Sequence, residues 1–297
     1  MKKFALIIAA VLISMGSWAQ ENLKFTPVNE CYVSEGYYSG DITIPDQVNL
    51  DGKTYLVTAI GDYAFRGRSN VTSVTMSYRI KKIGQYGLAG TGITTVTIPC
   101  NCREIGGYAL LSDNLHTINV DDYNQWFCVV NEGLFDKELL TLYQYPADNY
   151  QATFVIPEGV KKIESGSLMN MKVQTIDFPS SIENFGQYQF SSCPYLTDMI
   201  VRLTDVPQRM DQNFEDFQKH CTLYVPAESI ELYKQDSWWG GFKEIKSIDE
   251  YTSVKSVQVA SPRISSIYDV KGNKVDDTSK GLNIIKYANG TSKKVIK

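Results

Sequence analysis

Short segments in which apolar and polar residues alternate, and which end in proline, recur along the middle of the chain. Val96-Thr97-Ile98-Pro99 is matched by Phe154-Val155-Ile156-Pro157 and by Ile176-Asp177-Phe178-Pro179. Seven positions after the second apolar residue comes another one, usually followed by glycine, as in Ile105-Gly106. The alternation predicts a half-buried strand. The proline ends strand pairing and the glycine permits a turn, so each segment should begin a new coil.

The repeat has a period of about 22 residues. Ile83 and Ile105 are 22 residues apart, as are Ile163 and Phe185, whereas 58 residues separate Ile105 from Ile163. A unit this small cannot bury its own apolar face, so successive units must stack. The pattern therefore predicts a mainly β, leucine-rich-repeat-like solenoid of about seven coils between residues 41 and 226, with parallel strands from successive coils. The expected inward residues are Ile42, Ile44, Val74, Met76, Val96, Ile98, Ile118, Val120, Phe154, Ile156, Ile176, Phe178, Met199 and Val201.

Two irregularities interrupt the period. Asn49-Leu50-Asp51-Gly52 carries an Asp-Gly turn signal between strand-like runs, which predicts a hairpin that protrudes from one coil. The 58-residue spacing contains one period and about 36 further residues, in which residues 126–130, 133–135 and 139–143 resemble short β segments. After residue 252 the rhythm stops, and short β runs at residues 254–259, 264–270 and 282–287 predict a small C-terminal β appendage.

The first residues have the order of a secretory signal. Lys2 and Lys3 precede an apolar run of about ten residues, and Ser17-Trp18-Ala19 is a small-x-small cleavage pattern. The run is too short to span a bilayer, and no later segment approaches eighteen apolar residues. We therefore expect a signal peptide at residues 1–19, an N-terminal cap at 20–40, and an exported protein without a transmembrane segment.

The repeated pattern Val-Thr-Ile-Pro … Ile-Gly-x-Tyr-Ala-Leu/Phe resembles the BspA-like leucine-rich repeats of exported Bacteroidetes proteins. Residues 221–245 are similar to the closing cap of that family, and residues 267–297 are similar to a shortened sorting segment for type IX secretion. Glu164, in place of the glycine, departs from the pattern in one repeat. The resemblance implies a solenoid over residues 41–249 with its cap at 221–249, and a β tail at 250–297. It also implies a surface or secreted protein without enzymatic activity; some family members are adhesins.

Composition and charge remove several classes of function. The net charge of −4 disfavours a broad grip on nucleic acid or on anionic membrane, because both require clustered lysine and arginine. Cys100-Asn101-Cys102 lacks the C-x-x-C spacing of zinc sites. Cys193 lies at a coil end and Cys221 begins the cap strand, so we expect buried free thiols, with a disulfide from Cys100 or Cys102 to another coil as the alternative. His220 and Cys221 are adjacent, which suits a nucleophile–base pair poorly on a strand. We expect no catalytic residues, no metal and no cofactor.

The outward positions of the repeated strands suggest a binding surface. They form a polar face, although such a ladder is also an ordinary exposed strand surface: Ser73, Thr75, Thr95, Thr97, Thr117, Asn119, Thr153, Thr175 and Asp177. The first hypothesis is a monomeric binding or adhesion protein whose partner is a protein or glycan on a host or microbial surface or in extracellular matrix. The alternatives are a secreted hydrolase whose site forms only in three dimensions, and a structural surface scaffold. The expected location is the cell surface or the medium, with the periplasm as the alternative.

Overall fold

The structure is a computed structural model that describes residues 23–27, 31–208 and 216–251, and four strands beyond them. It divides into two compact units, residues 1–246 and 247–297. The predicted signal peptide at residues 1–19 and the β run predicted at 254–259 lie outside the described residues.

One row of strands contains the repeated Thr-x-Ile-x-Ile segments. Strands at the seven predicted places are β3 (Gly40–Thr43), β6 (Val71–Thr75), β8 (Thr95–Ile98), β10 (Thr117–Val120), β14 (Thr153–Val155), β16 (Thr175–Phe178) and β18 (Asp198–Val201). Where these strands pair they are parallel, with Ile118 beside Val96 and Ile176 beside Phe154. The predicted solenoid is confirmed, and β19 (Thr222–Val225) and β20 (Glu244–Ser247) continue the row after β18.

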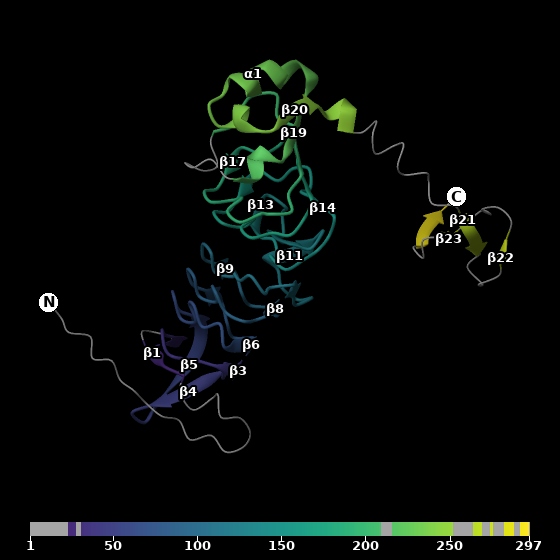
Figure 1. Cartoon of the computed structure of the whole chain (residues 1–297). Coiled ribbons are helices and arrows are strands. Elements are labelled where there is room, and N and C mark those ends of the chain that lie inside the picture. Colours follow the sequence, from purple (N-terminus) through teal and green to yellow (C-terminus); the bar gives the residue numbers. More distant parts are fainter. Residues whose placement is uncertain are drawn as a thin grey trace. The chain divides into compact units, whose positions relative to one another are not determined.

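A second row of short strands closes each coil. It contains β2 (Cys31–Val33), β5 (Lys53–Ile60), β7 (Lys82–Ile83), β9 (Glu104–Ile105), β15 (Lys162–Ile163) and β17 (Asn184–Phe185). β1 (Phe25–Pro27) pairs antiparallel with β2 at the first coil. Each of these strands ends at an apolar residue, which glycine follows in β5, β7, β9 and β17, and the spacing of about 22 residues brings equivalent apolar residues of neighbouring coils side by side. Figure 1 shows the coils following one another in chain order, from purple to green.

Both predicted irregularities are confirmed. β4 (Gln47–Leu50) and the first half of β5 form an antiparallel hairpin, in which Asp51 and Gly52 both have positive φ, at 51° and 77°. In the longer insertion, β11 (Phe127–Val130), β12 (Gly133–Asp136) and β13 (Thr141–Gln144) pair in sequence. β13 then joins the second row beside β15. The insertion thus separates β10 from β14 along the chain.

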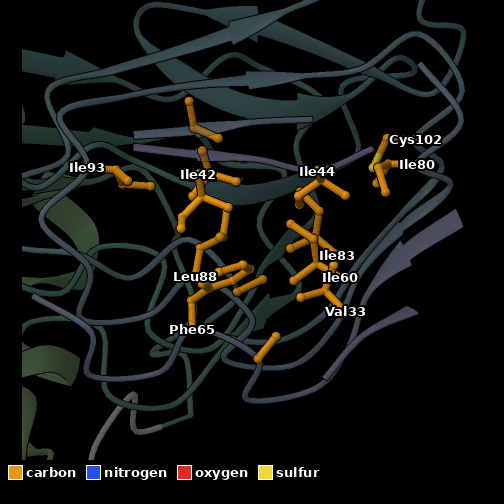
Figure 2. Close-up of a cluster of buried hydrophobic side chains, with 14 of the residues drawn as sticks. Val33, Ile42, Ile44, Ile60, Phe65, Ile80, Ile83, Leu88, Ile93 and Cys102 are labelled. Carbon is orange, nitrogen blue, oxygen red and sulfur yellow. The ribbon is translucent and has the colours of Figure 1, made fainter. Parts of the chain in front are cut away.

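The core of the first unit consists of two hydrophobic clusters. One runs from Leu23 to Leu134 and the other from Phe135 to Phe242, so the division falls within the insertion. Figure 2 shows part of the first cluster, where Ile42, Ile60, Ile83 and other side chains of successive coils gather. Of the predicted inward residues, all are buried except Met76 and Val120, which are half-buried.

Aromatic side chains cover the last coil. The rings of Trp238, Trp239, Tyr233 and Phe242 pack together around the short helix α1 (Ile230–Gln235). Trp239 donates its indole N–H to the Pro207 carbonyl at 3.0 Å, and Tyr233 donates its hydroxyl to a carbonyl of the coil below. The polar groups of Trp239 and Tyr233 are therefore hydrogen-bonded although both rings are buried, and the cap covers the end of the second cluster.

The second unit has a sheet of its own. It is antiparallel, in the order β22-β21-β23-β24. The strands are β21 (Ile264–Tyr268), β22 (Lys274–Val275), β23 (Leu282–Tyr287) and β24 (Ser292–Ile296). The β runs expected from residues 264 and 282 onward are therefore confirmed.

Candidate binding surface

The predicted polar face extends over β6, β8 and β10. Thr75, Thr95, Thr97 and Asn119 are exposed on these strands. Ser73, Thr117 and Thr153 are half-buried at the same outward positions. The strands position them because each alternates with an inward apolar residue that anchors the backbone in the core.

At the other end of the row, the expected face is covered. Thr175 and Asp177 on β16 are buried, at 4% and 9% exposure, which corrects the expectation that their side chains face solvent. Arg202, from the next coil, pairs with both carboxylate oxygens of Asp177, at 2.9 and 2.8 Å. This bidentate pair raises the pKa of Arg202 and covers the carboxylate. Asp177 therefore joins two coils and is not available to a ligand.

A groove opens where two neighbouring strands do not pair. β6 pairs with β3 and β8 pairs with β10, but β6 and β8 belong to different sheets. Just before β8 begins, the backbone N–H of Gly92 donates to the carbonyl of Val71, the first residue of β6, at 2.9 Å. Between the strands lies a cavity of about 370 Å³, lined by Ser73, Val74, Thr75, Met76, Tyr78, Thr95, Thr97, Pro99 and Asp121. Four of the predicted face residues thus converge on one groove.

The groove offers hydroxyls and an acidic rim. Among the described residues, no hydrogen-bond partner is found for the hydroxyls of Thr75, Thr95 and Thr97. Ser73 donates to Asp41 at 2.7 Å, and this bond, with a second from Thr72, lowers the pKa of the Asp41 carboxyl. Because a hydroxyl both donates and accepts, the site suits a ligand rich in polar groups.

The cysteines and histidines form no reactive site in the described part of the chain. All six cysteines are free thiols, and burial raises the pKa of Cys31 to about 11 and that of Cys102 to about 12. Cys221 is fully buried while His220 is exposed, so the two side chains diverge as their adjacency predicts. Among the described residues, no group of three or more His, Cys, Asp or Glu could hold a metal ion.

A ladder of tyrosines runs along the turns that follow the second strand row. Tyr63, Tyr86 and Tyr108 stack face to face, with centroids 5.4 and 4.8 Å apart. All three have positive φ, between 52° and 60°, a conformation that L residues seldom adopt. The signal in the sequence is a tyrosine three residues after the apolar residue of Ile-Gly, repeated in successive coils.

A membrane-crossing helix is not found in the described residues: none of their helices is both long and apolar enough.

The family model for the BspA type leucine rich repeat region matches residues 48–152 and 143–235, in six copies. The chain belongs to the BspA-type leucine-rich repeat family. The matched residues include nearly all of the hairpin, the insertion, and the cap up to the end of α1.

Several solved structures are similar to this BspA-type chain. A leucine rich cell surface protein from Faecalibacterium prausnitzii is 15% identical, with a TM-score of 0.46 over 82% of this chain and 98% of that one. A leucine-rich repeat protein from Eubacterium ventriosum is 17% identical, with a TM-score of 0.45 over 77% of both chains. The pneumococcal vaccine antigen PcpA is 14% identical, with a TM-score of 0.38 over 80% of this chain and 99% of that one. The comparison with curated proteins gives no significant match.

Proposed function

We propose that this chain is a non-catalytic, exported BspA-type repeat protein that binds a protein or glycan at a host or microbial surface. The groove between β6 and β8 carries the proposal, because Ser73, Thr75, Thr95 and Thr97 converge there. Repeat solenoids use extended surfaces of this kind to bind partners. Export is supported by the signal pattern of residues 1–19.

The chemistry of the groove favours binding over hydrolysis. Threonine hydroxyls and the aromatic face of Tyr78 can hold a polar partner, but hydrolysis needs a nucleophile beside a base or two facing carboxylates. Asp121, the single carboxylate in the lining, accepts a hydrogen bond from the backbone N–H of Tyr123 at 2.9 Å. Its side chain therefore stabilises a turn.

The test is to probe an array of glycans and matrix proteins with the mature chain, beginning at Gln20. Thr97→Arg places a long side chain in the groove and should weaken binding to any hit by about tenfold or more, as blocking a central contact does. Thr54→Arg is the matched control, because Thr54 is equally exposed but lies in the β4–β5 hairpin. Both variants should keep the thermal unfolding midpoint of the parent chain.

Each alternative has its own outcome. Cleavage of an array glycan or peptide by the parent chain would establish the secreted hydrolase instead. Equal loss of binding in both variants would move the binding surface away from the groove. Absence of any hit, together with co-purification of other surface proteins, would favour the structural scaffold.

A further inference from the structure

A second recess lies beside the tyrosine ladder, outside the strand face. It has a volume of about 370 Å³ and is lined by Arg66, Gly67, Ser69, Tyr86, Ala89, Gly90, Thr91, Leu111, Asp113, Asn114 and Asn170. Gly67 and Gly90 occupy equivalent places in two successive coils, and a Cβ on Gly90 would lie 3.2 Å from the Gly67 Cα. Both glycines have positive φ, at 69° and 66°. Because neither glycine has a side chain, the two adjacent coils leave space for the recess.

The Arg66 side chain lines the recess, and two tyrosine rings hold it in place. Its guanidinium carbon lies 5.4 Å from the Tyr63 ring centroid and 4.8 Å from that of Tyr86. Stacking on aromatic faces leaves the N–H donors at the edge of the guanidinium plane free to bind. Among the described residues, the Arg66 side chain has no hydrogen bond or ion pair. A planar, oriented cation of this kind matches a carboxylate through two parallel hydrogen bonds.

The lining of the recess also contains an acid and two amides. Asp113 accepts a hydrogen bond from the Asn170 side chain at 2.5 Å, across the insertion, and Asn114 lies beside them. The carboxylate can accept from ligand hydroxyls, while the amides both donate and accept. Because Asp113 would repel a second negative group, the recess favours a ligand with one anionic end and several hydroxyls.

We propose that this recess binds a carboxylate-bearing sugar, with its carboxylate on Arg66 and its hydroxyls toward Asp113 and Asn170. A volume of about 370 Å³ is at the small end of ligand pockets, which suits one or two sugar units of a longer acidic glycan. The proposal stands apart from the groove between β6 and β8, since the two sites share no residue. The tyrosine ladder then has a role beyond packing, because its rings hold Arg66 in place for the sugar.

The test compares two probes that differ only in the carboxylate, methyl β-D-glucuronide and methyl β-D-glucoside, by NMR titration of the mature chain. We expect the glucuronide to bind at least about tenfold more tightly, which is about 1.4 kcal/mol. The backbone amide signals of Gly67, Gly90 and Asn114 should move. The preference should weaken as salt rises, because the carboxylate–guanidinium pair is partly exposed.

Arg66→Gln should abolish the preference for the glucuronide, and Arg66→Lys should reduce it, because a lysine cannot form the bidentate pair. Arg103→Gln is the matched control, since Arg103 is an exposed arginine of a neighbouring coil outside the recess. Thr97→Arg should leave glucuronide binding intact, so failure of the groove and failure of the recess are distinguishable. The proposal is overturned if both sugars bind equally, if neither binds, if acetate binds as tightly as the glucuronide, or if Arg66→Gln binds like the parent chain.

Discussion

Phe178 is a fully buried residue of the second hydrophobic cluster and contacts two other aromatic rings. Its side chain has no exposed surface, and its ring meets Phe185 at 5.3 Å and Phe190 at 6.1 Å in edge-to-face contacts. These contacts join the two strand rows of one coil to the turn that follows. Each such pair adds stabilisation beyond the burial of its area.

Replacing Phe178 by alanine should therefore lower the free energy of unfolding by about 3–5 kcal/mol, the usual range for a fully buried phenylalanine. Tyr195→Ala is the control, because this ring is 53% exposed and its loss should change stability by no more than about 0.5 kcal/mol. Denaturant unfolding measures both. Equal unfolding midpoints for Phe178→Ala and the parent chain would show that the assigned inward register is wrong.

Gly166 shows how one coil accommodates its neighbour across the insertion. It stands where Tyr63, Tyr86 and Tyr108 stand in earlier coils and shares their positive φ, at 71°. A Cβ on Gly166 would lie 2.2 Å from the ring of Tyr108. The ladder thus ends on a glycine, because the Tyr108 ring occupies the space of the next side chain.

Gly166→Ala should be more destabilising than Gly159→Ala. Both residues have positive φ, so each substitution carries a backbone cost of about 1–2 kcal/mol, but no atom lies within 4 Å of a Cβ on Gly159. The difference between the two variants in thermal or denaturant unfolding isolates the clash with Tyr108. If the two variants lose equal stability, the ring moves aside without cost and the ladder does not constrain this coil.

At the scale of elements, the sequence predicted those strands and turns that depend on a pattern of neighbouring residues. The alternation around Ile98 and Ile176 placed strands, and Asp51-Gly52 placed a hairpin, because these features depend on side-chain alternation and turn conformation within a few residues. The candidate surface was predicted only in part. Asp177 is outward by alternation, yet Arg202 from the next coil covers it, and such a long side chain leaves no periodic signal.

The missed features depend on how coils meet. Nothing in the residues of β6 or β8 alone indicates that these two strands do not pair, since pairing is decided by the spacing of whole coils. The recess at Arg66 likewise requires Gly67 and Gly90 to coincide in adjacent coils. The repeated tyrosine was visible in the sequence, but its positive φ and its stacking become apparent only in three dimensions.

The division of the core at the insertion predicts that the solenoid does not unfold uniformly. Ile98 belongs to the first cluster and Phe178 to the second, and both are fully buried. In solenoids each repeat is coupled chiefly to its neighbours. Phe178→Ala should therefore reduce amide hydrogen-exchange protection mainly after residue 135, and Ile98→Ala mainly before it. Native-state exchange read by mass spectrometry distinguishes this from cooperative unfolding, in which both variants would lose protection everywhere.

At the scale of the whole molecule, the second unit is a separate sheet whose role can be tested by deletion. Its antiparallel sheet pairs its own strands, and contacts divide the chain at residues 246 and 247. A segment of about fifty residues buries only a limited core, so we expect an appendage and not a complete sorting domain.

Deleting residues 252–297 in the native host should leave the solenoid folded and its export unchanged, while lowering its stability. Cell fractionation measures export, and a chain with Lys2 and Lys3 replaced by glutamate provides the unexported reference. Accumulation of a folded, truncated solenoid in the periplasm would instead identify the tail as a sorting signal, because only the step after the inner membrane would then have failed.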